Sequence, residues 1–128
     1  YLGAYYDSGD YDTYAPFNLV NQTAILDIFD INLSDVSNLG EGSRFEHCKS
    51  KISGVSGHET DKLVEGAEGF TILAKGLNDN GGADLVYKSF ASGGEVLNFG
   101  SVSLWHNNDP NLSLLIQRFL KQNRVKEE

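Results

Sequence analysis

The sequence contains no methionine, two prolines and a single cysteine, Cys48. One cysteine cannot form a disulfide bond within the chain, so the fold depends on its apolar core. At 128 residues the chain is long enough for such a core, because a domain of this size buries roughly two thirds of the surface that its unfolded chain exposes. We therefore expect one domain over residues 1–128.

The sequence also lacks a long apolar run and, in its first third, any basic side chain. No apolar stretch approaches the ~18 residues of a membrane span. Residues 1–40 contain no lysine or arginine, and the formal net charge is −8. A nucleic-acid-binding protein needs a basic surface to neutralise phosphates, so we expect no nucleic-acid partner. The acidic segment is either an ordinary solvated surface or a patch that meets a basic partner.

The chain begins at Tyr1, which indicates a processed protein or part of a longer one. It contains three sequons for N-linked glycosylation, Asn21-Gln-Thr23, Asn32-Leu-Ser34 and Asn111-Leu-Ser113. A removed signal peptide would explain the missing methionine, although a trimmed chain would look the same. We expect an extracellular, secreted protein that is a candidate glycoprotein.

Strand periodicity and turn residues agree three times between Phe70 and Trp105, which predicts a β-meander. The expected strands are 70–75, 83–90 and 95–105, joined by turns at 78–82 and 92–94. In the first strand Leu73 is the apolar residue on the wrong face. The apolar phase of the third strand changes midway, which predicts a β-bulge near Gly100-Ser101.

Two longer helices are predicted. Asp109-Pro110 has the pattern of a cap followed by proline at the first helical position, and apolar residues then recur at three-four spacing through Leu120. Residues 21–33 also fit a helical stripe, with Asn21 or Thr23 as the cap, and a strand over 25–33 is the alternative.

Shorter helices are expected at 34–39, at 44–52 after a capping-box pattern, and at 61–65. The chain is therefore predicted to be α+β. An antiparallel sheet over about residues 70–105 carries helices on one face, including an amphipathic C-terminal helix over about 110–124.

No motif in the sequence specifies a reaction or a cofactor, so neither is assigned. Cys48 lies on an apolar stripe, where a lone thiol is typically a small buried hydrophobe rather than a nucleophile. The aspartates of residues 7–12 and the polar residues of 78–84 invite a calcium interpretation, but both lack the full calcium-loop pattern. Asp27 and Asp30 are three residues apart, as on a solvated helix face.

Five of the six tyrosines fall in residues 1–16, whose only charged residues are aspartates. Such an arm lacks fixed structure unless its rings find a surface. Tyrosine provides large contact area at low entropic cost. The arm is therefore either a contact strip for a partner or an edge strand packed on its own domain.

Two classes of function follow. The preferred hypothesis is a small, acidic, toxin-like effector or binding protein that contacts a protein or glycan partner, without catalytic chemistry. Its candidate binding residues are Tyr5, Tyr6, Tyr11, Tyr14, Trp105 and His106. The alternative is a small enzyme or ligand carrier with an aromatic-lined pocket between sheet and helices, with Tyr87, Trp105 and His106 at its mouth.

Overall fold

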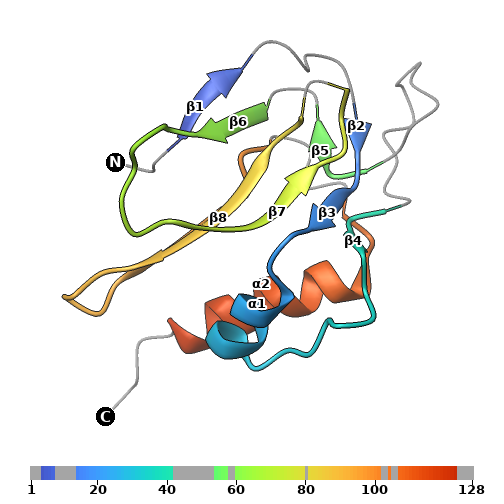
Figure 1. Ribbon diagram of the computed structural model, residues 1–128. Coiled ribbons are helices and arrows are strands. Elements are labelled where there is room, and N and C mark those ends of the chain that lie inside the picture. The colour runs from blue at the N-terminus through green and yellow to red at the C-terminus, as the bar shows by residue number, and fades with distance from the viewer. Residues whose placement is uncertain are drawn as a thin grey trace.

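The computed structural model describes residues 4–7, 14–41, 54–57, 60–79, 81–101, 104 and 107–123. Eleven helices and strands occur within these ranges, in the order β1 (Ala4–Asp7), β2 (Tyr14–Ala15), β3 (Phe17–Leu19), α1 (Gln22–Phe29), β4 (Asn38–Leu39), β5 (Ser56–Gly57), β6 (Thr60–Leu63), β7 (Thr71–Gly76), β8 (Asp84–Ser89), β9 (Glu95–Asn98) and α2 (Pro110–Gln122) (Figure 1). The predicted α+β class is confirmed.

The main sheet has five antiparallel strands in the order β4-β3-β7-β8-β9. Its last three strands are the predicted meander. The turn between β8 and β9 is closed by the Gly93 N–H, which donates to the Phe90 carbonyl at 2.9 Å, and by the Phe90 N–H, which donates to the Gly94 carbonyl at 2.8 Å. Two further sheets have two strands each and pair β1 with β6 and β2 with β5.

Both long helices begin at the predicted caps. Asn21 Oδ1 accepts from the Ala24 N–H at 3.0 Å at the start of α1, so a helix rather than the alternative strand begins there. The helix ends at Phe29, short of the expected end at residue 33, because Asp30 adopts a left-handed conformation with φ 55°. Asp109 caps α2, and Pro110 is its first residue. The Arg118 guanidinium donates to the Phe29 carbonyl at 2.9 Å, so α2 supplies a partner for the C-terminal end of α1.

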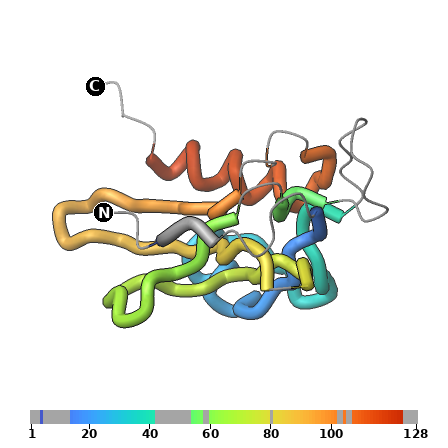
Figure 2. Tube along the Cα trace, turned by 90° about the horizontal axis from the view of Figure 1, so that it is seen from above, coloured from blue at the N-terminus to red at the C-terminus, as the bar shows by residue number. Residues whose placement is uncertain are grey.

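The helices lie together on one side of the main sheet (Figure 1). Their buried side chains join those of β3, β7 and β8 in one apolar cluster. Phe29 lies at its centre, with its ring edge-on to those of Tyr87 and Phe119 at centroid distances of 5.5 and 6.5 Å. Helix α2 runs along the hairpin of β8 and β9 (Figure 2), where the Gln122 amide donates to Glu95 at 2.8 Å.

The β-bulge lies in β7 rather than near Gly100, so the predicted position is wrong. Ile72 pairs with Val86 and Ala74 with Leu85, which leaves Leu73 as the extra residue. The bulge turns both Leu73 and Ala74 into the apolar cluster. The apparent mismatch at Leu73 in the sequence pattern is therefore the mark of the bulge itself.

The third strand ends at Asn98, short of the predicted end at residue 105. At Gly100 the chain turns away with φ +60°, and its carbonyl accepts from the Asp61 N–H at 2.6 Å. Ser101 then forms a bridge with Thr60. A Cβ on residue 100 would lie 2.7 Å from the Asp61 carbonyl oxygen, so glycine permits this close approach.

The expected helix over 61–65 is wrong, because β6 occupies most of that stretch. Its register with β1 runs from Ala4 opposite Leu63 to Asp7 opposite Thr60. A helix of a few residues gains too few hydrogen bonds to offset its nucleation, whereas both edges of this strand find partners. The short helix over 34–39 is also wrong: the segment is a turn followed by β4, which pairs with β3. The predicted helix over 44–52 lies outside the described residues.

Two parts of the predicted N-terminal arm pair with the rest of the protein, as β1 and β2. The packed alternative therefore describes these two stretches. Strand β8 is buried on both of its faces. Leu85 and Tyr87 face the helices, while Asp84 and Val86, on the opposite face, are also buried. The pair β1–β6 lies on that second side (Figure 1).

Candidate functional site: an acidic pocket beside helix α2

A pocket of about 370 Å³ lies where the segment around β4 meets the start of α2. Its walls are three acidic side chains, three neutral polar side chains and one valine: Asp35, Glu41, Asp109, Ser37, Asn38, Asn111 and Val36. The acidic members come from two segments that are far apart in the chain, residues 35–41 and 109–111. The pocket is therefore a product of the tertiary structure rather than of a local motif.

The β4 side of the pocket is held by buried apolar residues on either side of it. Leu33 and Leu39 are buried in the apolar cluster, and Leu39 also pairs with Phe17 of β3. Gly40 follows with φ +72°, and a Cβ there would lie 2.1 Å from Val55 Cγ2. This close packing fixes the direction in which the chain continues to Glu41.

Asp109 joins the two sides of the pocket. Its Oδ2 accepts from the Gly40 N–H at 2.7 Å, and its Oδ1 accepts from the Asn111 N–H at 2.9 Å. The Asp109 N–H in turn donates to Asn107 Oδ1 at 2.8 Å. The N-cap of α2 is therefore also the contact that holds the loop after β4, and its carboxylate has a fixed position.

The charge of the pocket is negative. Asp35 and Glu41 are exposed and Asp109 is half-buried, and the described residues of the wall include no lysine, arginine or histidine. Carboxylates gathered around a concavity concentrate negative potential there. Asn38, Asn111 and Ser37 add neutral hydrogen-bonding groups. The arrangement suits a cationic group that also donates hydrogen bonds, such as an ammonium or a guanidinium.

Sequence reasoning missed this pocket. The sequence pattern identifies Asp109 only as a helix cap and Asp35 only as part of the acidic bias of residues 1–40, and it does not single out Glu41. The available signal was that bias together with the absence of basic residues from the first 40 positions.

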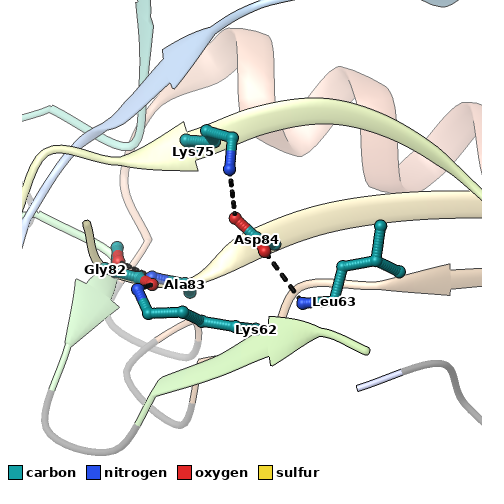
Figure 3. Close-up of polar contacts among 7 residues, drawn as sticks. Lys62, Leu63, Lys75, Gly82, Ala83 and Asp84 are labelled. Atoms are coloured by element: carbon teal, nitrogen blue, oxygen red, sulfur yellow. Dashed lines mark hydrogen bonds and ion pairs between the residues drawn. The ribbon is translucent and has the colours of Figure 1, made fainter. Parts of the chain in front are cut away.

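A second polar cluster is internal and joins β6 to the β7–β8 hairpin (Figure 3). The Asp84 carboxylate, 7% exposed, accepts from the Leu63 N–H at 2.8 Å and from Lys75 Nζ at 3.2 Å. Lys62 Nζ donates to the Gly82 carbonyl at 2.8 Å. Each contact satisfies a group that burial would otherwise leave without a partner, so this cluster serves the fold.

Strand β5 is attached in a similar way. The Ser56 hydroxyl donates to Asn78 Oδ1 at 2.8 Å and accepts from the Ala83 N–H at 3.0 Å. Asn78 and Asp84, two of the residues weighed as calcium ligands, thus have internal partners, whereas Asn80 lies outside the described residues. No group of three or more histidine, cysteine, aspartate or glutamate side chains suited to a metal ion occurs in the described ranges.

Among the described residues, the wall of the pocket includes none of the binding residues predicted from the sequence. Tyr14 is 8% exposed and belongs to the buried interior. Tyr5 and Tyr6 lie in β1, opposite Lys62 and Asp61. Tyr11, Trp105 and His106 lie outside the described residues, as does Cys48.

Tyr87, expected at the mouth of an aromatic-lined pocket, is buried instead. Its hydroxyl donates to Glu95. Burial, with a smaller contribution from Glu95, raises the pKa of Tyr87 to about 12. Its neutral phenol is therefore the form that the folded protein favours.

Comparison with protein-family models, with characterised proteins and with solved structures finds no match to this chain. Within the part of the chain that the structure describes, neither helix is long and apolar enough to cross a membrane. The case for a function therefore comes from the pocket and from the charge of the chain.

Proposed function

We propose that this protein is an extracellular, effector-type binding protein that holds a basic side chain of a protein partner in the acidic pocket. The observation that carries the proposal is the convergence of Asp35, Glu41 and Asp109 on one concave surface. The formal net charge of −8 supports it, because long-range attraction favours the approach of a basic partner.

The three carboxylates have different roles in this proposal. Asp109 already accepts two backbone hydrogen bonds, so it gives the pocket a fixed charge at its base. Asp35 and Glu41 are exposed and are free to close on an incoming guanidinium. A planar guanidinium presents several donors at once and matches paired carboxylate oxygens, so arginine is the preferred contact.

The test is a titration of the ¹⁵N-labelled protein with N-acetyl-arginine amide, followed through backbone amide chemical shifts. The uncharged isostere N-acetyl-citrulline amide is the matched probe. Shifts confined to residues 35–41 and 109–111, seen with arginine but not with citrulline, are the expected result. Loss of one exposed charge contact costs up to ~1 kcal/mol. Because D35N/E41Q removes two such contacts, it is expected to weaken binding about tenfold.

The matched control is D27N/E65Q, which removes the same two charges from exposed positions outside the pocket. It is expected to bind the arginine probe almost as the unmodified protein does. Equal weakening by both double variants would show that net charge alone attracts the probe, and the pocket would then have no specific role. Shifts with a neutral oligosaccharide, but none with arginine, would instead favour a glycan partner.

The extracellular part of the proposal rests on the three sequons. Its test is the intact mass and N-terminal sequence of the protein isolated from its native source. Recovery of the protein outside the cell is the expected result. A longer chain confined to the cell would contradict it.

A further inference from the structure

The three sequons have different structural surroundings, and the difference bears on which asparagine can carry a sugar. An N-linked oligosaccharide is attached to the side-chain nitrogen of asparagine, and a hydroxyl residue two positions later is required. The sugar is bulky and hydrophilic, so the folded protein must leave it in solvent. A suitable acceptor therefore has both its asparagine and its hydroxyl residue on the surface.

Two of the asparagines are built into helix starts. Asn21 is half-buried, and its side chain caps α1 by accepting from the Ala24 N–H at 3.0 Å. Asn111 is half-buried in the first turn of α2 and forms part of the pocket wall. Its partner Ser113 lies within the helix and accepts from Asn107 Nδ2 at 3.0 Å. A sugar at either position would have to be accommodated against a helix terminus.

Asn32 is in a different situation, because the chain there alternates between the interior and solvent. Ile31 and Leu33 are 4% and 3% exposed, whereas Asn32 and Ser34 are both exposed. The two buried apolar side chains anchor the segment to the core. The two residues that define the sequon consequently face outward together.

A hydrogen bond also holds the side chain of Asn32 in place. The Ser34 N–H donates to Asn32 Oδ1 at 3.0 Å, so the segment forms an Asx-turn. This contact engages the oxygen of the amide, whereas the sugar is attached to the nitrogen. The turn also brings the Ser34 backbone close to the acceptor side chain.

We infer that Asn32 is the carbohydrate-attachment site of this protein and carries an N-linked oligosaccharide, an inference that rests on the extracellular part of the proposed function. Attachment joins Asn32 Nδ2 to the anomeric carbon of a lipid-linked oligosaccharide donor, with the lipid diphosphate as leaving group and the amide proton released. Asn21 and Asn111 remain unmodified.

The experiment uses the full chain secreted from a eukaryotic cell line behind a cleavable signal peptide, with glycopeptide mass spectrometry before and after enzymatic release of N-linked sugars. Sugar at Asn32, and bare peptides at Asn21 and Asn111, are expected. The variants N32Q and S34A both lose the sugar, while S34T keeps it. Because S34A retains the asparagine, its loss of sugar ties attachment to the sequon rather than to a damaged fold.

Sugar on Asn21 or Asn111 with a bare Asn32, or no sugar at all, would overturn the geometric argument. The same mapping on protein from the native source separates this failure from that of the proposed function. A native chain that is bare, when the secreted chain carries sugar on Asn32, would overturn the extracellular assignment and the modification in nature. The arginine titration uses sugar-free protein, so its outcome is independent of both.

Discussion

The main sheet with its two helices and the two short strand pairs are stabilised in different ways. Helices α1 and α2 meet strands β3, β7 and β8 through an apolar cluster in which many side chains share the burial. The pairs β1–β6 and β2–β5 are attached to the same sheet through individual hydrogen bonds, among them those of the Asp84 carboxylate and the Ser56 hydroxyl. Apolar burial has no preferred direction, whereas each of these hydrogen bonds depends on a few atoms.

The largest effect is expected at the centre of the apolar cluster. Phe29 is 1% exposed and contacts the rings of Tyr87 and Phe119. F29A removes a large buried side chain and leaves a cavity, so the free energy of unfolding is expected to fall by about 3–5 kcal/mol. Urea denaturation followed by circular dichroism measures the change. The control is L26A on the same helix, where the side chain is 43% exposed and a change within about 0.5 kcal/mol is expected.

The second effect tests the polar attachment. D84A removes the acceptor of the Leu63 N–H and leaves that donor without this partner, so a loss of about 2–3 kcal/mol is expected. In D84A, hydrogen exchange of the folded protein should accelerate more at the Leu63 amide in β6 than at the Leu85 amide in β8, each compared with the same amide of the unmodified protein. Equal acceleration at both amides would mean that β6 and the main sheet unfold as one unit, and the distinction between the two regions would fail.

The matched control for Asp84 is its exposed partner. Lys75 has a side chain that is 52% exposed, so screening by solvent keeps the value of its ion pair low. K75A is expected to cost less than about 1 kcal/mol and to leave the exchange of the Leu63 amide nearly unchanged. A cost close to that of D84A would assign the stabilisation to the ion pair instead of the backbone hydrogen bond.

A smaller effect depends on pH. Y87F removes the hydrogen bond to Glu95, and a loss of about 1 kcal/mol is expected at neutral pH. The folded-state pKa of Tyr87 is raised from 10.0 to about 12, so its contribution is fully present below pH 10 and is lost as pH rises toward 12. Unfolding measured from pH 8 to 11.5 should show the difference between the two proteins shrinking above pH 10. A constant difference would contradict the raised pKa.

The smallest effect has the opposite sign. Thr60 is fully buried, and its hydroxyl has no hydrogen-bond partner within the described part of the chain. T60V keeps the β-branched shape and removes this hydroxyl, so a gain of about 0.5–1 kcal/mol is expected in urea denaturation. T71V, at a half-buried position in β7, is the matched substitution and is expected to be nearly neutral. Destabilisation by T60V would reveal a partner for the hydroxyl.

The predictions from sequence succeeded where neighbouring residues determine the structure. Asn21 and Asp109 cap their helices through atoms only two or three residues away. The turn at 90–94 is closed by its own backbone. The same logic failed at residues 61–65, where a plausible cap and an apolar pair suggested a helix but distant strands supplied better partners.

The candidate site shows the same contrast between what neighbouring residues determine and what distant segments determine. Each acidic residue of the pocket is visible in the sequence, but Asp35 and Asp109 are far apart along the chain, and no periodicity links them. Their meeting depends on the hydrogen bond from Gly40 to Asp109 at 2.7 Å. The acidic bias predicted the sign of the surface, whereas its shape required the fold.

The sequence by itself determined the two capped helices, the meander, the acidic charge and the three sequons, because local hydrogen bonds, side-chain periodicity and composition are properties of neighbouring residues. The tertiary structure alone decided the bulge at Leu73, the strand identity of β6, the burial of Asp84, the pocket and the outward position of Asn32. Each of these depends on which distant segments supply partners, since a buried polar group or an apolar side chain is stabilised only by what the fold places against it.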